Sequence, residues 1–238
     1  MKITVINGTQ KHGVTYNLKE VFLEPFRDAA QITEYYLPKD CPGFCAGCTN
    51  CFLKDEKECK DAEHVQKIEK SMLEADLLVF ATPVYVYHST GAMKNMLDHF
   101  GYRWMVHRPA KEMFGKRAVI ITQCIGAGVR STIKDVRDSL SWWGISYIRS
   151  CSFRLMTDIF WDNLPESKRA QMTSAVRKMA EKMKKIDYSR PARTGIITRC
   201  KFYAVRMLNK SITKGNTEAA DAAYWKANGW LEEKRPWR

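Results

Sequence analysis

The chain has 238 residues, 45% of them hydrophobic, and a formal net charge of +13. This length and composition suit one α/β domain with a hydrophobic core and an additional segment, and they exclude a disordered or fibrous chain. No run of about 18 apolar residues occurs, so no membrane-spanning helix is expected. The sequence opens on a strand-like pattern without the layout of a secretory signal, so we expect a cytoplasmic protein.

The positive charge is concentrated toward the carboxyl end. Residues 1–164 hold 21 Lys and Arg against 19 Asp and Glu, whereas residues 165–238 hold 18 against 7, so the second part supplies +11 of the +13. A strongly basic protein can bind nucleic acid. Because the first part is nearly neutral and carries no nucleic-acid motif, we expect no nucleic-acid partner.

Five apolar, strand-like runs alternate with segments of helical periodicity. The runs are 2–7, 32–37, 76–83, 117–124 and 145–153, and the helical faces fall at 18–26, 65–72, 93–100, 133–140 and 176–186. Pro25 should kink or end the first helix, and Pro165 should stand in the first turn of the fifth. The alternation predicts an α/β fold, a flavodoxin-like doubly wound sheet of five parallel strands with a cofactor beyond their carboxyl ends.

A basic extension follows the last of these helices. We expect residues 1–187 to form the domain and residues 188–238 a helical C-terminal extension. One apolar helical face of this extension contains Ile196, Ile197, Cys200, Tyr203, Met207 and Leu208. We expect the extension to dock on the domain or on a second subunit, since its tryptophans suit packing anchors. The alternative, a basic amphipathic helix on an anionic membrane, is less favoured.

Two loops at the expected carboxyl edge of the sheet suit a phosphorylated aromatic ligand. "NGTQKHGVT" (7–15) opens a helix, so its backbone N–H groups and the helix dipole favour an anion. It lacks the fingerprints of triphosphate and dinucleotide loops, and a monophosphate fits it better. The loop after the third strand holds Tyr85 and Tyr87, against which a flat ring can stack.

A third loop completes the expected site. "QCIGAGVRS" (123–131) follows the fourth strand, and its Gly126 and Gly128 permit a close approach of the backbone. Each loop alone also suits an ordinary polar turn. Their coincidence at one edge of a parallel sheet indicates a phosphate cradle, an aromatic wall and a glycine floor.

These motifs resemble a known family. "NGTQKHGVT" resembles the G-S-x-R-x-x-G-[NS]-[ST] loop of NAD(P)H-dependent FMN reductases in the flavodoxin superfamily, and "PVY" with Gly91, Lys94 and Asp98 resembles their P-x-Y-x5-G-x2-K-x3-D signature. The ending "YWKANGWLEEKRPW" is similar to that of bacterial flavodoxin-family oxidoreductases. Thr9, Lys11 and Val14 depart from the usual Ser, Arg and Asn or Ser, and His99 stands where Arg is common.

The resemblance implies an FMN site and a homo-oligomer. Residues that would hold the phosphate are Thr9, Lys11, Gly13, Val14 and Thr15. Residues that would frame the isoalloxazine ring are Pro83, Val84, Tyr85, Val86 and Tyr87, with Cys124, Gly126 and Gly128 behind it. The flavin carries the chemistry, so no catalytic side chain is expected.

A cysteine-rich loop at 41–59 follows the second strand. Cys45, Cys48, Cys51 and Cys59 give C-x2-C-x2-C-x7-C, where the iron–sulfur flavoprotein branch of the family carries a compact cysteine motif. Four thiolates so spaced can ligate a [4Fe–4S] cluster. Unligated thiols, a zinc site and, last, a disulfide remain alternatives. Cys41 is a spare ligand candidate.

We therefore expect an FMN-dependent oxidoreductase. By resemblance, electrons pass from NADH or NADPH through FMN to a quinone, a nitro compound, a free flavin or a redox protein. A cluster would pass the two electrons of the reduced flavin on one at a time. The first alternative is a non-enzymatic, flavodoxin-like electron carrier. The second is a metal-binding module without flavin.

Overall fold

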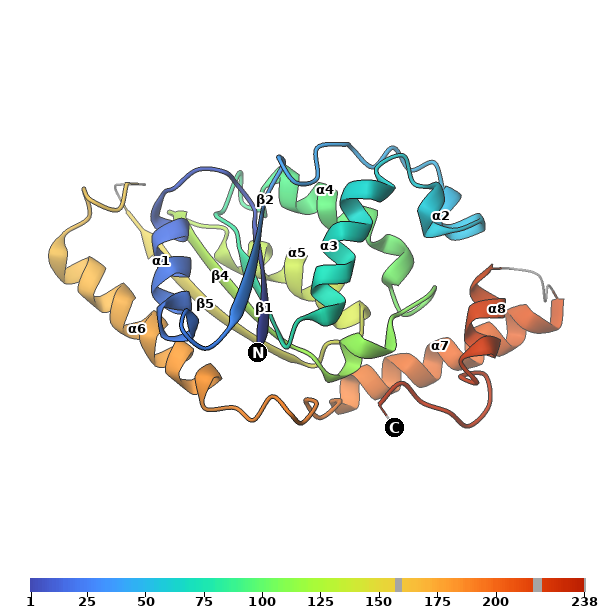
Figure 1. The fold of residues 1–238 in the computed structure, drawn as a ribbon. Coiled ribbons are helices and arrows are strands. Elements are labelled where there is room, and N and C mark those ends of the chain that lie inside the picture. Colours follow the sequence, from blue (N-terminus) through green and yellow to red (C-terminus); the bar gives the residue numbers. More distant parts are fainter. Residues whose placement is uncertain (157–159, 216–219, 238) are drawn as a thin grey trace.

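The computed structural model of the chain describes residues 1–156, 160–215 and 220–237 (Figure 1). Strands alternate with helices through most of this length. The elements are β1 (Lys2–Asn7), α1 (Val14–Leu23), β2 (Gln31–Tyr36), α2 (Asn50–Leu53), α3 (Ala62–Glu74), β3 (Leu77–Ala81), α4 (Gly91–His99), β4 (Arg117–Ile125), α5 (Val129–Trp142), β5 (Tyr147–Leu155), α6 (Glu166–Lys184), α7 (Ile196–Gly215) and α8 (Ala220–Ala227).

The five strands form one parallel sheet in the order β2-β1-β3-β4-β5. This is the doubly wound flavodoxin-like order, so the predicted fold class is confirmed. β1 has the predicted bounds, and β3 ends at Ala81 instead of Pro83. The backbone beyond β3 still follows β4 through Thr82 N to Ile121 O at 3.0 Å and Val84 N to Gln123 O at 3.0 Å. Pro83 has no N–H to add to this ladder.

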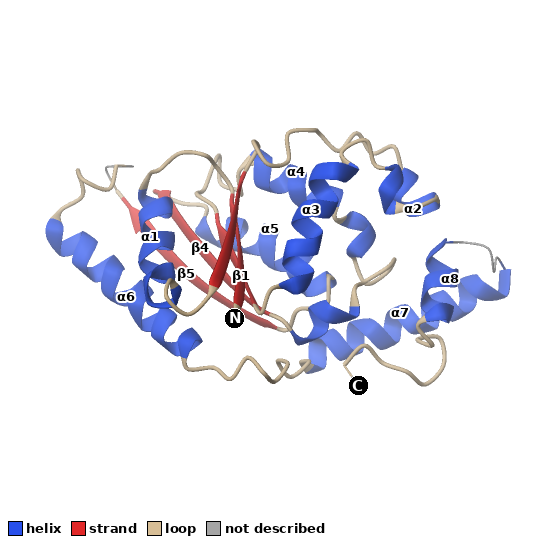
Figure 2. Ribbon diagram, in the orientation of Figure 1, coloured by secondary structure: helices blue, strands red, loops and turns tan. Residues whose placement is uncertain are grey.

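Helices cover both faces of the sheet (Figure 2). Successive side chains of a strand point to opposite faces. Ile6 and Phe80 therefore pack with α3, α4 and α5, whereas Val5 and Val79 pack with α1 and α6. β3 is buried at every position, because apolar helices lie on both of its sides.

Helix ends follow local chemistry with small corrections. Pro25 ends α1 as predicted, because the chain tightens into a 3₁₀ turn at Glu24–Phe26. Pro165 is the N-cap of α6, one position before the predicted first turn. β5 begins at Tyr147 instead of Ile145. Ile145 N bonds to Leu140 O at 3.0 Å past Gly144, whose φ is +106°, and so it closes α5.

The C-terminal extension packs against the domain through a third apolar cluster. Its buried members are Met105, Phe114, Phe202, Val205, Trp225 and Trp230. The segment before α7 lies beside the residues that precede β4 and β5, since Ala192 N bonds to Gly115 O at 2.7 Å and Gly195 N to Ser146 Oγ at 3.0 Å. The beginning of the extension therefore lies at the amino-terminal ends of these strands.

The face of α7 that contacts the domain differs from the apolar face read from the sequence. Phe202 and Val205 point into the cluster, whereas Ile196, Ile197 and Met207 are exposed. The helix carries two apolar stripes, and the one that contains Phe202 meets the aromatic residues of α8 and its neighbours. Among the described residues, no helix combines the length and apolar composition needed to cross a bilayer.

Candidate functional site

The loop between β1 and α1 presents unsatisfied donors at the carboxyl edge of the sheet. Gly13 is the N-cap of α1, and no side chain caps the helix there. Thr15 Oγ1 is buried and has no hydrogen-bond partner in the described part of the chain. The first N–H groups of a helix and a free hydroxyl together suit an anion. This loop therefore has the chemistry of a phosphate-binding site.

Glycine fixes the path of this loop. A Cβ on Gly8 would lie 2.5 Å from Thr82 Oγ1, so a side chain there would displace the residue that follows β3. The Thr90 hydroxyl also donates to Gly8 O at 2.6 Å, and Gly8 N bonds to Ala81 O at 2.8 Å. The loop is thus held against the chain that follows β3.

A single cavity joins this loop to the ends of β3 and β4. It is lined by Thr9, Lys11, Gly13, Val14, Thr15, Pro83, Val84, Tyr85, Gln123, Cys124 and Ile125. The structure therefore brings together most of the residues assigned to a flavin from the sequence. Val86, Tyr87, Gly126 and Gly128 do not line this cavity.

Gln123 and Ile125 line the cavity without having been predicted. Gln123 Oε1 is buried and has no hydrogen-bond partner among the described residues, so it offers a free acceptor to a ligand. Its signal in the sequence is a polar side chain inside the apolar run of β4. A buried polar residue near the carboxyl end of a central strand suits ligand contact better than packing.

The turn after β3 forms a strained rim beside the cavity. Val86 and Tyr87 have φ of 47° and 67°, a conformation that is costly for a β-branched residue. Tyr85 and His88 close the turn with backbone hydrogen bonds of 2.9 and 3.1 Å. His88 Nδ1 in turn lies 3.1 Å from Asp135 Oδ2 on α5. Such strain is found most often at ligand-binding segments.

Gly128 supports this rim. Its φ is +108°, and a Cβ there would lie 2.5 Å from Val84 Cγ1 and 2.8 Å from Tyr87 Cα. Gly126 also has a positive φ, of +78°, but a Cβ there would meet nothing within 4 Å. Gly128 therefore gives the tyrosine turn room to approach α5, instead of forming a floor for the ligand.

The four predicted cluster ligands line a second, smaller cavity. Cys45, Cys48, Cys51 and Cys59 all border it, together with Asp61 and His99 among others. Cys41, the spare candidate, lies outside it and is buried in the core below. Burial, with Asp61 and Cys59 nearby, raises the pKa of the Cys41 thiol to about 12, so it is a poor thiolate ligand.

The thiols in this cavity influence one another. Burial is the main cause that raises the pKa of both Cys51 and Cys59. Cys59 next raises the pKa of Cys51, the Asp61 carboxylate raises that of Cys59, and Cys45 and Cys48 add to both. A bound cation would remove that repulsion. Cys59 Sγ also lies 3.6 Å from His99 Nδ1. In the described residues, no three His, Cys, Asp or Glu side chains already stand in a metal-ligating arrangement.

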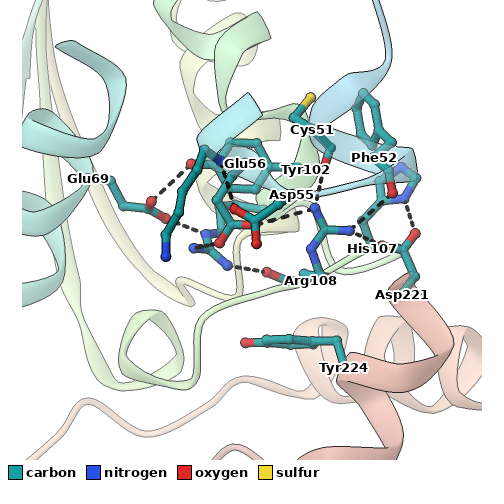
Figure 3. Close-up of polar contacts among 12 residues, drawn as sticks. Cys51, Phe52, Asp55, Glu56, Glu69, Tyr102, His107, Arg108, Asp221 and Tyr224 are labelled. Carbon is teal, nitrogen blue, oxygen red and sulfur yellow. Dashed lines mark hydrogen bonds and ion pairs between the residues drawn. The ribbon is translucent and has the colours of Figure 1, made fainter. Parts of the chain in front are cut away.

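An arginine holds the helix that carries Cys51. The Arg108 guanidinium donates to the carbonyl oxygens of Cys51 and, at 3.2 Å, of Phe52 on α2. It also lies 2.8 Å from Asp221 Oδ1 and 3.4 Å from Glu56 Oε2, and only 6% of its side chain is exposed. Figure 3 shows Arg108 between the short helix of the cysteine loop and Asp221 of α8.

The same contact area involves the chain on either side of Arg108. His107 Nδ1 lies 2.7 Å from Asp221 Oδ2, and the His107 ring packs on Phe52 with centroids 4.5 Å apart. Trp225 Nε1 donates to His107 O at 2.6 Å. No local pattern in the sequence indicates this connection, because it joins segments more than a hundred positions apart.

Over part of its length the chain is similar to iron–sulfur flavoproteins. An iron–sulfur flavoprotein of Archaeoglobus fulgidus is 33% identical over 99 residues, which is 41% of this chain and 48% of that protein. A second iron–sulfur flavoprotein of the same organism is 22% identical over 148 residues, 60% of this chain and 63% of that protein. The chain thus spans about half to three fifths of the length of these curated relatives.

Solved structures of low sequence identity share the fold. NAD(P)H:quinone oxidoreductase from Methanothermobacter marburgensis superposes with a TM-score of 0.59 at 15% identity, covering 79% of this chain and 98% of that one. An FMN-dependent NADH-azoreductase of Bacillus anthracis, in complex with FMN, superposes with a TM-score of 0.58 at 14% identity, covering 77% and 99%.

The sequence model of the family described as NADPH-dependent FMN reductase matches residues 1–158, about two thirds of the chain. That range includes both cavities and all five strands. The resemblance read from the loops is confirmed: the chain belongs to the NADPH-dependent FMN reductase family.

Proposed function

We propose that the protein is an FMN-dependent oxidoreductase that takes electrons from NADH or NADPH and passes them to a small-molecule or redox-protein acceptor. Membership of the FMN reductase family supports the flavin and the nicotinamide donor. The acceptor belongs to the quinone, nitro, free-flavin or redox-protein classes. FMN, when bound, supplies the hydride and electron chemistry, and the chain supplies binding and orientation.

The cavity at the carboxyl edge fits FMN. The observation that carries the proposal is the uncapped start of α1 beside the unpartnered Thr15 hydroxyl. Backbone N–H groups at Gly13, Val14 and Thr15 would hold the phosphate, with Thr9 and Lys11 beside it. Nothing in the cavity resembles a second phosphate site for FAD, because one helix start serves it.

The opposite end of the cavity suits a flat ring system. Pro83, Val84 and Tyr85 would frame the isoalloxazine, with Val86 and Tyr87 forming its outer rim and Cys124 lying beneath. The free Gln123 oxygen would accept a hydrogen bond from the ring, which orients it without placing charge in the site.

Identification of the flavin tests this proposal. Denaturing the purified protein should release FMN, which chromatography separates from FAD, and NADH or NADPH should bleach the flavin absorbance. Release of FAD, or of no flavin, would show that the cavity is wrongly assigned. Bound FMN that neither nucleotide reduces would favour the non-enzymatic electron carrier instead.

We also propose that Cys45, Cys48, Cys51 and Cys59 hold a [4Fe–4S] cluster. Support comes from the four thiols bordering one cavity and from the iron–sulfur flavoproteins among the relatives. The donor set fits a cluster, since thiolates are its usual ligands. Iron and acid-labile sulfide analysis of anaerobically prepared protein should give about four irons per chain. Cys48→Ser should lose the iron and keep FMN.

The proposal extends to the organisation of the chain. We place the flavin-binding domain at residues 1–187 and the basic extension at 188–238, of which 216–219 and 238 lie outside the described residues. Eight free thiols support a reducing, cytoplasmic location. The family resemblance predicts a homo-oligomer, and analytical ultracentrifugation measures the oligomeric state.

A further inference from the structure

Helix α7 exposes an apolar stripe on the side that faces away from the domain. Its members are Ile196, Ile197, Cys200, Ala204, Met207, Leu208 and Ile212. The exposed fraction of its large side chains ranges from 45% at Ile212 to 79% at Ile196. Spacings of three and four residues place them along one side of the helix. A row of large, exposed apolar side chains of this kind on a folded chain marks an interaction site.

The stripe cannot turn inward, because the opposite side of α7 is fixed. Phe202 is fully buried and stacks on Trp225 with ring centroids 5.0 Å apart. Trp230 meets Phe202 edge-on at 5.9 Å. The start of the helix is held by Ser146 Oγ, which lies 2.8 Å from Thr198 Oγ1. The apolar side chains outside are therefore a fixed feature of the surface.

Cations border the stripe, and no acidic residue lies in the helix. The sequence of α7 contains no Asp or Glu. By helical periodicity, Lys201 and Lys210 stand at opposite borders of the stripe. Lys210 is exposed, whereas Lys201 is held by the domain, where its Nζ lies over the ring of Trp142 at 4.3 Å and donates to Ser141 Oγ at 2.8 Å. An exposed apolar stripe on a helix whose only charged residues are basic suits an anionic partner that also accepts apolar side chains.

Charge argues against a second copy of the helix as that partner. Ile197, Cys200, Ala204 and Met207 follow the a and d spacing of a helix pair. In such a pair the flanking positions would include Lys201 and Lys210, and α7 has no acidic residue that could form an ion pair with them. The basic extension as a whole also opposes such a pair, because residues 188–238 hold 11 Lys and Arg against 4 Asp and Glu, a net charge of +7.

We propose that α7 is a membrane-surface helix that binds anionic lipid bilayers. Its apolar stripe would lie among the upper acyl chains, parallel to the bilayer plane, and the exposed Lys210 would contact the headgroups. The convex stripe has no aromatic anchor that would fit a protein pocket. This proposal is independent of the flavin and of the cluster.

The position of α7 leaves the flavin cavity accessible. The helix starts beside the amino-terminal ends of β4 and β5, whereas the cavity lies at the carboxyl ends of β3 and β4. Figure 1 shows α7 at the edge of the molecule beyond the sheet. A protein bound to a bilayer through α7 would keep the cavity open to water-soluble reactants. Any contact between subunits would then be made by the α/β domain.

Co-sedimentation of the full chain with vesicles tests the proposal. Vesicles of phosphatidylcholine with about one third phosphatidylglycerol should bind the protein, and phosphatidylcholine alone should bind it about tenfold more weakly. Binding should weaken at high salt. The double variant Ile197→Asp/Leu208→Asp should reduce binding about tenfold or more, because it places carboxylates in the stripe. Leu53→Asp, the same change at an exposed leucine of α2, is the matched control and should bind like wild type.

Three results would overturn the proposal. The first is wild-type protein that ignores anionic vesicles. The second is binding that the double variant leaves unchanged. The third is a wild-type dimer in ultracentrifugation that the double variant converts to monomer while neither protein binds vesicles, which would assign the stripe to a second copy. Thermal unfolding of both variants verifies that they remain folded.

Discussion

Arg108 and Asp221 lie 113 positions apart in the chain, and their side chains form an ion pair of 2.8 Å. Because Arg108 also holds the carbonyl oxygens of Cys51 and Phe52, this pair connects α8 to the helix that carries one of the four clustered thiols. The FMN reductase family match ends before α8, so this contact joins the family fold to the extension. The extension therefore acts on the geometry of the cysteine loop.

Replacing Asp221 should loosen that loop. Asp221→Asn removes the charge facing Arg108, which costs about 1.5–3 kcal/mol for a charge-assisted hydrogen bond. In a Cys200→Ser background, which removes an exposed thiol, the remaining cysteines should react several-fold faster with a chromogenic disulfide reagent. Asp138→Asn is the control, since Asp138 pairs with Lys134 on the surface of α5. Equal reaction rates in the Cys200→Ser protein and in its Asp221→Asn and Asp138→Asn derivatives would show that α8 does not hold the cysteine loop in place.

Thr15 should affect the stability of the protein and its affinity for FMN in opposite directions. Thr15→Val replaces a buried hydroxyl that has no partner by a methyl group of similar shape. The flavin-free protein should gain up to about 1 kcal/mol of unfolding free energy, whereas FMN affinity should fall about fivefold or more through loss of a phosphate donor. Denaturant unfolding and titration calorimetry measure the two effects.

A second buried threonine provides the matched control for that experiment. Thr132 Oγ1 on α5 also lacks a partner in the described residues, and Thr132 does not line the flavin cavity. Thr132→Val should therefore stabilise the flavin-free protein and leave FMN affinity unchanged. An equal loss of affinity in both variants, or in neither, would contradict the phosphate assignment.

Gly128 and Gly126 should differ sharply in their tolerance of alanine. Both have positive φ, so alanine costs about 1 kcal/mol at either position through backbone strain. Gly128→Ala adds a clash with Val84 and Tyr87, and we expect a further loss of about 1–3 kcal/mol together with weaker FMN binding. Equal stability of the two variants would show that the tyrosine turn moves freely.

The fold could be predicted from the sequence because the patterns that indicate its strands and helix ends are local. The run that became β3 is apolar at every position, since helices cover both sides of it, and Pro25 stops α1 by removing an N–H. The parallel order then places the loops of Gly13 and Pro83 at one edge, which is why most cavity residues could be named. Topology carried that inference more than any single motif.

What the sequence concealed depends on contacts between distant segments. Arg108 finds Asp221 only once α8 has folded back, and no local pattern encodes that pairing. Gln123 was hidden inside a strand that otherwise reads as core. On α7 two apolar stripes compete, and the stripe of Phe202 is buried because Trp225 and Trp230 come from elsewhere to meet it. Periodicity indicated the stripe of Ile196 and Met207, whereas the folded structure buries the stripe of Phe202 and Val205.

Lys116 should make the stability of the protein depend on pH in the alkaline range. Burial lowers the pKa of its ammonium group to about 8 from 10.5, although Nζ donates to Leu73 O at 2.7 Å and to Ala75 O at 2.5 Å. Between these two pH values the unfolded chain binds more protons than the folded one, so the unfolding free energy rises with pH. The penalty of the buried charge is complete below pH 8 and fades as pH approaches 10.5.

Comparison with a variant that lacks the Lys116 ammonium group isolates this effect. Lys116→Met has no such group, so the stability of wild type relative to the variant should improve by up to about 1.4 kcal/mol per pH unit above pH 8. The two lost carbonyl contacts shift the variant by an amount that does not change with pH, and other titrating groups cancel in the difference. Lys178→Met, at an exposed site on α6, should leave the pH slope of wild type unchanged. Denaturant unfolding at several pH values gives the slopes, and parallel curves for wild type and Lys116→Met would mean that the ammonium group is solvated.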